Sequence, residues 1–174
     1  MRRVSCIVNK VHDGDTVTVT YNTKTKKKVV VRLYGIDAPE LPQLFGLEAK
    51  NHLTGMIKDK KVLIEFLGED QYNRQIGKVF VDKIYVNNEM VKSGYAHWFD
   101  AYAPLDEDLK QSQNEAENQQ LGLWSYPDPI IPWKWRIIEK IKQLQAQLEK
   151  PTYQEKRIRD MSVFVTDIDL DLFH

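Results

Sequence analysis

Residues 13–21 read DGDTVTVTY, a turn signal joined to an alternating strand. The dipeptide Asp13-Gly14 is typical of tight hairpin turns. The threonines and valines that follow alternate, as in a strand with one buried face. The preceding residues 4–10, VSCIVNK, predict the other strand of this hairpin. The fold is therefore expected to start with an antiparallel strand pair.

Further β-branched and apolar runs predict three more strands, at residues 29–36, 61–67 and 76–82. The spacing of apolar residues predicts a helix at residues 45–58. A short helix is expected at 86–93, ended by Gly94, and a polar helix rich in Gln and Glu at 105–120. Five short strands, with helices between and after them, favour an α+β fold. We expect a five-stranded OB-fold β-barrel with packed helices, followed by a C-terminal helix and tail.

The chain is expected to have three parts: an OB-fold domain at 1–126, a Pro-rich connector with an amphipathic helix at 127–150, and an acidic and apolar tail at 151–174. The helix, at about 134–149, carries apolar residues at 4-3-4 spacing: Ile137, Ile141, Leu144 and Leu148. This stripe either packs on its own domain or pairs two copies in a homodimer. The tail fits either a poorly ordered terminus or a strand that adds to a sheet edge.

The composition indicates a globular protein, with 42% hydrophobic and 29% charged residues in a chain of 174. The formal net charge is zero, but the charge is unevenly distributed. Residues 1–61 hold twelve Lys and Arg against six Asp and Glu, whereas residues 62–134 hold six against twelve. The basic excess of the first segment favours a polyanionic partner there.

Several classes of site are disfavoured by the sequence. The single cysteine, Cys6, excludes an internal disulfide and a thiolate zinc cluster, and the four histidines lack ligand-like spacing. No window has the length of a transmembrane helix, so no membrane partner is expected. The start of the chain lacks the apolar core of a signal peptide. We expect a cytoplasmic protein if Met1 is the native start and a secreted one if a leader has been removed.

A second acidic cluster, Asp37-Ala38-Pro39-Glu40, ends an apolar strand and is expected to meet Asp15 at one rim of the barrel. Carboxylates brought together repel one another unless a cation compensates, and their oxygens suit a hard cation such as calcium. Arg32 lies within the same strand. It is either a structural partner of a carboxylate or a bidentate ligand for a phosphate. Together these groups favour metal-assisted chemistry on a phosphodiester.

The chain resembles the staphylococcal nuclease (thermonuclease-like) family over about residues 4–126. The resemblance rests on five segments that occur in family order: HDGDTVTV, VRLYGIDAPE, YNRQIGKVFV, VNNEMVKSGYAHW and LGLW. It implies an OB-fold barrel with helices and a calcium-dependent endonuclease of DNA and RNA. The resemblance also implies cleavage between phosphorus and the 5′ oxygen, which leaves 3′-phosphate ends.

The resemblance assigns metal and water chemistry to four residues. Asp15 and Asp37 match the carboxylates that bind calcium, and Ala38 stands where the family supplies a backbone carbonyl. The family often has a hydroxyl residue at this position, but a carbonyl ligand does not depend on the side chain. Glu40 matches the glutamate that orients or deprotonates the attacking water.

The resemblance also assigns residues to the substrate. Arg32 and Arg74 match two phosphate-clamping arginines, and Tyr72 matches an aromatic residue that contacts the nucleotide. Tyr102 is a second candidate for a nucleotide contact. Gln71 departs from the family pattern, because a basic residue is expected there.

Two other classes of protein compete with an enzyme. One is a non-catalytic OB-fold module that binds nucleic acid through stacking and a basic groove. The other is a protein-interaction domain that uses the C-terminal helix and tail. A decayed enzyme would normally lack at least one catalytic residue, and this chain has all five: Asp15, Arg32, Asp37, Glu40 and Arg74. The sequence therefore favours the enzyme.

Overall fold

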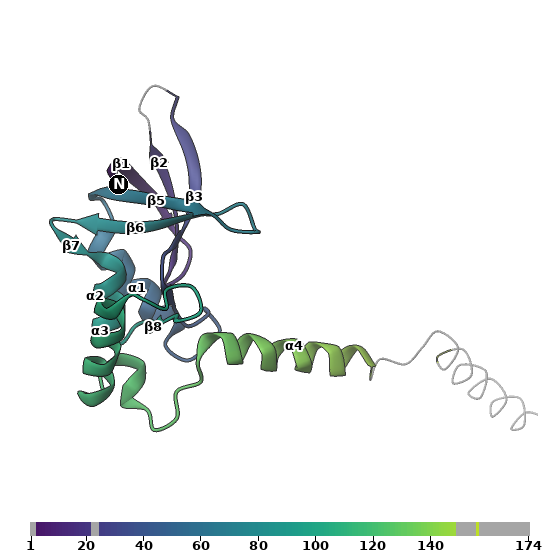
Figure 1. Ribbon diagram of the computed structural model, residues 1–174. Helices are drawn as coiled ribbons and strands as arrows, with labels where there is room; N and C mark the ends of the chain where they lie inside the picture. The colour runs from purple at the N-terminus through teal and green to yellow at the C-terminus, as the bar shows by residue number, and fades with distance from the viewer. Residues whose placement is uncertain (1–2, 22–24, 149–155, 157–174) are drawn as a thin grey trace, which may run out of the picture. The chain divides into compact units, whose positions relative to one another are not determined.

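Five strands form a closed barrel in the computed structural model, which describes residues 3–21, 25–148 and 156 (Figure 1). The barrel strands are β1 (Arg3–Val11), β2 (Thr16–Tyr21), β3 (Lys27–Leu33), β5 (Lys61–Glu69) and β6 (Gln75–Val81). They follow the order β3-β2-β1-β5-β6 with antiparallel neighbours, and a parallel pairing of β3 with β6 closes the ring. The predicted OB-type barrel is confirmed.

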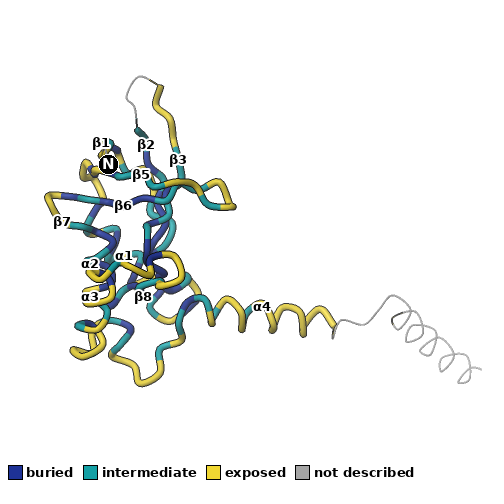
Figure 2. The backbone as a smooth tube through the Cα atoms, viewed as in Figure 1, coloured by how far each residue is buried: buried dark blue, intermediate teal, exposed yellow. Residues whose placement is uncertain are grey.

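The alternation of β2 explains why this strand forms a barrel wall. Val17 and Val19 point inward and are 1% and 0% exposed, whereas Thr18 and Thr20 between and after them are only partly buried. Similar inward rows from the other strands complete the core, which Figure 2 shows in dark blue. Burial of branched apolar side chains on one face of each strand stabilises the closed wall.

The third predicted strand is divided in the structure. We expected one strand at 29–36, but β3 ends at Leu33 and a two-residue strand β4 (Ile36–Asp37) follows the turn. Gly35 has φ +73°, a left-handed conformation that glycine adopts at little cost. The turn takes the chain off the barrel, where β4 pairs with β8 (His97–Trp98). The acidic segment at residues 37–40, which we call the acidic loop, therefore starts on the two-stranded β4–β8 ribbon and not on the barrel.

Three helices pack on the barrel. Their bounds are α1 (Gly46–Ile57), α2 (Val86–Lys92) and α3 (Glu107–Asn118), each close to the predicted segment. Helix α1 buries Ala49, Leu53 and Ile57, which recur every four residues along one face. A short strand β7 (Ile84–Tyr85) pairs antiparallel with the end of β6, and a 3₁₀ helix η1 (Gly122–Ser125) follows α3.

A last helix, α4 (Pro132–Leu148), agrees with the predicted segment 134–149. The first compact unit extends to Trp135, and the second begins at Arg136. Within the first unit, the Trp133 ring lies 5.6 Å from that of Phe99. The boundary predicted at residue 126 stays a prediction, and the tail at 151–174 lies outside the described residues apart from Lys156. None of the described helices has the length and apolar character needed to cross a membrane.

Candidate active site

The turn between β1 and β2 carries the first acidic residues. The Asp13 side chain accepts a hydrogen bond from the Asp15 backbone N–H at 3.0 Å, which fixes the turn. Gly14 allows a close approach. A Cβ at this position would lie 2.6 Å from the Ala38 Cβ and 2.8 Å from the Ala49 Cβ. The turn is thus pressed against the acidic loop on one side and against α1 on the other.

Arg32 joins the two acidic segments. Its Nη2 lies 3.0 Å from Asp15 Oδ2 and 2.9 Å from Asp37 Oδ1. The guanidinium is mostly buried, with its side chain 16% exposed. Carboxylates from a hairpin turn and from a separate ribbon therefore converge on one nitrogen. The other guanidinium end, Nη1, donates to the Leu33 carbonyl at 3.2 Å.

Asp15 is held on both of its oxygens. The Thr16 hydroxyl donates to Oδ1 at 2.9 Å, and the Ala38 backbone N–H donates to Oδ2 at 2.8 Å. Ala38 is also almost fully buried, and its N–H ties the acidic loop directly to the first turn. Buried charges of this kind are stable only when hydrogen bonds and counter-charges surround them.

Asp13 belongs to the same group, although sequence reasoning gave it only a role in the turn. Burial and the neighbouring Asp15 charge raise the pKa of the Asp13 carboxyl to about 7, against the opposing effects of the Asp15 N–H and Arg32. The site thus gathers more carboxyl groups than one guanidinium neutralises. The signal that could have indicated this was the spacing of the two aspartates, two residues apart at the end of a strand.

Glu40 is the last residue of the acidic loop, and its backbone is held by hydrogen bonds with Gln43. The Gln43 N–H donates to the Glu40 carbonyl at 2.8 Å, and the Glu40 N–H donates to Gln43 Oε1 at 3.2 Å. Gln43 Nε2 in turn donates to the carbonyl of Ile130, in the Pro-rich segment. Gly46 packs directly on the Glu40 carbonyl, where a Cβ would collide. Nothing in the sequence indicated that Gln43 supports Glu40, since Gln43 is itself held by Ile130, a residue far along the chain.

Arg74 lies in the turn between β5 and β6. Its Nε is 2.8 Å from Asp70 Oδ2, and its backbone N–H donates to Asp70 Oδ1 at 3.0 Å. Burial raises the pKa of Asp70, but the hydrogen bonds from Arg74 and from the Tyr72 backbone outweigh this effect and bring it below the usual range. These contacts hold Arg74 within its own turn.

The strand register nevertheless places the Arg74 turn near the site. Arg32 lies opposite Ile76 across the parallel pairing of β3 with β6, and Arg74 comes two residues before Ile76. The ion pair with Asp70 uses Nε, so both terminal nitrogens of the guanidinium remain outside that pair. Asp70 therefore braces the arginine while leaving its far end able to meet a phosphate.

The two tyrosines proposed to contact nucleotide are both at the surface. Tyr72 is 68% exposed and its ring lies 5.4 Å from the Arg74 guanidinium carbon. Tyr102 is 67% exposed and packs at 4.9 Å against Phe99, whose N–H donates to the Gly35 carbonyl at 2.8 Å. Exposed aromatic rings of this kind are suited to stacking, but their role stays a prediction.

The donor set at the rim fits a hard cation. No group of three or more His, Cys, Asp or Glu side chains in the described part of the chain is arranged to hold a metal ion. An ion would therefore need the two aspartates, a backbone carbonyl and water as ligands. Calcium accepts such mixed oxygen ligands, and the acidic excess around Asp13 and Asp15 supplies the charge that attracts it.

Residues 30–126 match the family described as staphylococcal nuclease homologue. The chain belongs to the staphylococcal nuclease family. An uncharacterized endonuclease of Haemophilus influenzae is 40% identical over 137 residues, which cover 79% of this chain and 75% of that protein. A micrococcal nuclease of Shigella flexneri is 36% identical over 143 residues, covering 76% of this chain and 80% of that protein.

Membership of this family makes the protein a nuclease, an endonuclease whose substrate is nucleic acid. A staphylococcal-like nuclease of Arabidopsis thaliana is also similar, with 36% identity over 110 residues, 63% of this chain and 34% of that protein. The match includes the acidic loop, Arg32 and the Arg74 turn, and the barrel observed here is the fold expected of the family.

Proposed function

We propose that this nuclease is a calcium-dependent endonuclease that hydrolyses DNA and RNA and leaves 3′-phosphate ends. The observation that carries the proposal is the convergence of Asp15 Oδ2 and Asp37 Oδ1 on Arg32 Nη2, at 3.0 and 2.9 Å. The carboxylates that would hold a cation thereby lie next to the guanidinium that would bind the phosphate. The likeness to the staphylococcal nuclease family supports the choice of calcium and of products.

Asp15, Asp37 and the carbonyl of Ala38 would hold the ion. When bound, calcium neutralises phosphate charge and lowers the pKa of a coordinated water. The two aspartates are already ordered by the Thr16 hydroxyl, the Ala38 N–H and Arg32, so few side chains would need to rearrange. This preorganisation reduces the entropic cost of binding.

Arg32 would bind two oxygens of the scissile phosphate. Its guanidinium is fixed in the site before substrate arrives, because both aspartates and the Leu33 carbonyl hold it. Negative charge builds on the phosphate oxygens in the five-coordinate transition state, and a donor aimed at this charge accelerates the reaction by about 10²–10³-fold. Arg74 would supply a second such donor from the neighbouring turn.

Glu40 would orient the attacking water or accept its proton, a role worth about 10²–10⁴-fold. The water oxygen forms a bond to phosphorus while the bond from phosphorus to the 5′ oxygen breaks. The leaving 5′ oxygen receives a proton from Arg74 or from water. The products are one fragment that ends in a 3′-phosphate and another that begins with a 5′-hydroxyl. Tyr72 and Tyr102 would contact the nucleotides.

The test is digestion of circular plasmid DNA and of a structured RNA with calcium, with magnesium and with a chelator. We expect cleavage with calcium, little with magnesium because it demands tighter octahedral geometry, and none in chelator. Fragment ends should become extendable by a polymerase only after phosphatase removes the 3′-phosphate. Full activity in chelator, or ends that extend without phosphatase, would contradict the proposal.

We also propose that α4 pairs two copies of the nuclease. Its stripe residues Ile137, Ile141, Leu144 and Leu148 are 57%, 49%, 47% and 85% exposed. Their 4-3-4 spacing is that of the buried seam of a coiled coil. Sedimentation equilibrium should give the mass of a dimer, and the double variant Ile141→Lys, Leu144→Lys should give that of a monomer. A monomeric wild type would overturn this pairing.

A further inference from the structure

The outward face of β1, β5 and β6 is a surface that the proposed chemistry does not use. The inward residues of these strands, such as Val62 and Val79, are 0% and 1% exposed. On the other side, Ser5, Leu63 and Phe80 form a row in register across the three strands. Leu63 is 42% exposed, so apolar surface faces solvent here.

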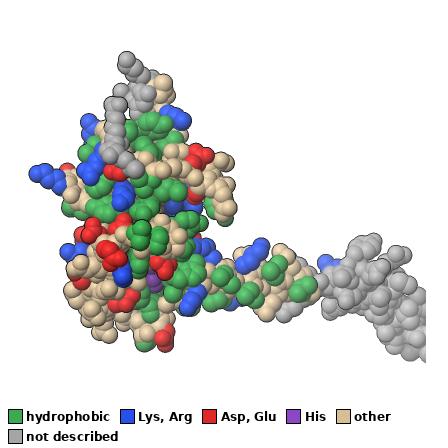
Figure 3. All heavy atoms as spheres, in the orientation of Figure 1, with side chains coloured by type: hydrophobic (Ala, Val, Ile, Leu, Met, Phe, Trp, Pro, Cys, Tyr) green, Lys and Arg blue, Asp and Glu red, His purple; other side chains and the backbone are tan. Residues whose placement is uncertain are grey.

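Basic side chains border this row. The Arg3 guanidinium carbon lies 3.7 Å from the centre of the Phe80 ring, a stacked cation–π contact. Lys61 lies at the start of β5, and Lys83 projects from the turn after β6. With Ser5, Leu63 and one acidic residue, Asp82, these residues line an open groove of about 410 Å³. Figure 3 shows hydrophobic side chains bordered by Lys and Arg over the strands, whereas Asp and Glu gather over α2 and α3.

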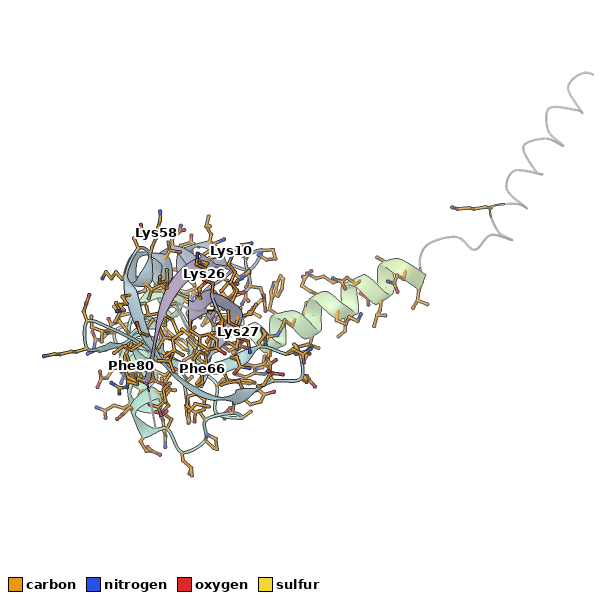
Figure 4. The ribbon with its side chains drawn as sticks, turned by 90° about the horizontal axis from the view of Figure 1, so that it is seen from above. Lys10, Lys26, Lys27, Lys58, Phe66 and Phe80 are labelled. Carbon is orange, nitrogen blue, oxygen red and sulfur yellow. The ribbon has the colours of Figure 1, made fainter. Side chains whose placement is uncertain are left out.

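The groove keeps an excess of positive charge. Its acidic neighbours are already engaged: Glu65 lies 3.9 Å from Arg3, and Asp82 lies 3.6 Å from Lys60. Among the described residues, neither Lys61 nor Lys83 takes part in an ion pair. In the view of Figure 4, the labelled Lys10, Lys26 and Lys58 lie along the upper edge of the barrel and Phe80 lies below them.

The groove and the candidate active site lie on the same outward surface. Arg32 and Ile76 are paired across β3 and β6, and both neighbours of Arg32 in β3 are buried, so Arg32 points outward. Ile76, Lys78 and Phe80 alternate along that side of β6. At about 3.3 Å per residue, Phe80 is about 13 Å from Ile76. A substrate of several nucleotides can span this distance, whereas a dinucleotide in the site cannot.

We propose that this groove, whose lining of three basic residues, Leu63 and Phe80 outweighs its single acidic residue Asp82, binds a single-stranded stretch of the substrate beyond the scissile bond. The inference rests on the proposed function. Unpaired cations suit phosphates, and an apolar row with a stacked arginine and phenylalanine suits exposed bases. Bases in a duplex are hidden from such a surface, so the apolar row favours a single strand over a double one.

Binding is tested with a 20-nucleotide single-stranded DNA and the inactive variant Glu40→Gln as background. The groove variant carries Arg3→Gln, Lys61→Gln and Lys83→Gln. Its matched control carries Lys92→Gln, Lys110→Gln and Lys134→Gln, which are exposed residues away from the groove and remove the same charge.

The salt dependence of affinity distinguishes the loss of phosphate contacts in the groove from a general loss of positive charge. Loss of three phosphate contacts should reduce the slope of log K against log salt by about 2 and weaken binding about 100-fold at 0.1 M salt. The matched control should change affinity by less than about threefold, because its lysines do not line the groove. Equal losses in both variants, or wild-type affinity in the groove variant, would overturn the proposal.

Phe80→Leu isolates the contribution of the ring, since it keeps apolar volume on the strand. Because Arg3 lies over this ring and Tyr85 is stacked with it, a base would stack on the Arg3 guanidinium that the ring supports. We expect about tenfold weaker binding of the single strand with an unchanged salt slope, because the guanidinium loses that support while phosphate contacts remain. Affinity for a 20-base-pair duplex should not change. If the duplex binds the wild type as tightly as the single strand and both lose affinity equally in the groove variant, the single-strand assignment is wrong.

Activity distinguishes a failure of this inference from a failure of the proposed function. In an otherwise wild-type background, the groove variant should lower kcat/KM for a 20-mer at least tenfold, mainly through KM, and leave kcat/KM for a dinucleotide unchanged. If the wild type cuts neither substrate, the proposed function fails while the binding assay still tests the groove. If the wild type cuts both and the groove variant loses activity on both equally, the groove inference fails alone.

Discussion

The interior of the barrel and the rim that carries the candidate active site are equally buried but differ in what stabilises them. Val19 and Ile64 in the interior are 0% exposed, and Asp15 and Asp37 at the rim are 6% and 1% exposed. The interior needs only apolar side chains of suitable volume. Each rim carboxylate instead depends on Arg32 from another segment. A substitution at the rim therefore removes an ion-pair partner from another residue, in addition to changing the packed volume.

The largest effect is expected for Arg32→Ala. It leaves Asp15 and Asp37 buried without their counter-charge, which should lower the free energy of unfolding by about 3–5 kcal/mol and abolish cleavage. Calcium should restore more stability to this variant than to the wild type, since the ion replaces the lost charge. Urea denaturation with calcium and with chelator measures both. Leu53→Ala in the interior is the control: it should lose about 2–5 kcal/mol with no response to calcium beyond that of the wild type.

Gly14→Ala should disturb the rim while leaving the barrel interior intact. The added methyl would press on Ala38 and Ala49, so we expect a loss of about 1–3 kcal/mol and a fall in kcat as the two acidic segments separate. Gly55→Ala is the matched control, because nothing lies within 4 Å of a Cβ at that exposed position of α1. It should stabilise the protein by about 0.5–1 kcal/mol. Equal stability changes in the two variants would contradict the claim that tight packing at Gly14 holds the two acidic segments together.

The pH dependence of stability should divide into two opposing parts. Burial lowers the pKa of His97 to about 4, so its contribution is complete above about pH 6.5 and is lost as the pH falls toward 4. Asp13 has the opposite sign. With its pKa raised to about 7, folding favours its protonated form, and stability is lost as the pH rises from about 4 toward 7.

Two variants resolve these contributions in thermal unfolding with chelator present. In Asp13→Asn, stability should rise between pH 4 and pH 6.5, because the contribution of His97 is retained and that of Asp13 is removed. In His97→Phe, stability should fall as the pH rises through the same window. The His97 ring packs at 4.7 Å against Trp124 and its Nε2 has no hydrogen-bond partner among the described residues, so Phe should fit. Identical pH profiles for both variants would contradict the assignment.

The smallest effect is expected for Gln43→Ala. This substitution frees the Glu40 backbone from Gln43 and breaks the link to Ile130. We expect a fall in kcat of about tenfold or less with little change in KM, because a misplaced base slows chemistry without weakening substrate binding. Gln75→Ala, which removes an exposed hydrogen bond to Glu69, serves as the control and should leave kcat unchanged. A loss of stability without a change in kcat would limit Gln43 to a structural role.

The sequence predicted those features that depend on local patterns. The Asp13-Gly14 turn and the alternating Thr and Val of β2 identified the first hairpin and, with the other strands, the barrel. The division of the third strand at Tyr34-Gly35 was not expected, because residues 29–36 form a nearly continuous apolar run. What divides the strand is the pairing of Asp37 with His97, which lies far along the chain.

The candidate site was anticipated in its acidic residues and Arg32 but not in its supports. Gln43, the brace from Asp70 to Arg74 and the raised pKa of Asp13 all depend on contacts that the fold creates. Such contacts join polar residues with no periodicity of their own, so pattern analysis has no signal for them. The structure brings Asp15, Arg32 and Asp37 together, but the catalytic, metal-binding and nucleotide-binding roles given to the site residues, Tyr72, Tyr102 and Ala38 among them, remain predictions.

The most direct test of the account compares calcium binding with turnover in two variants. Titration calorimetry should show that Glu40→Gln binds calcium nearly as the wild type does, while kcat falls about 10²–10⁴-fold. Asp37→Asn should lose most of its calcium affinity. Wild-type turnover in Glu40→Gln, or wild-type calcium affinity in Asp37→Asn, would contradict a metal-assisted hydrolysis at this rim.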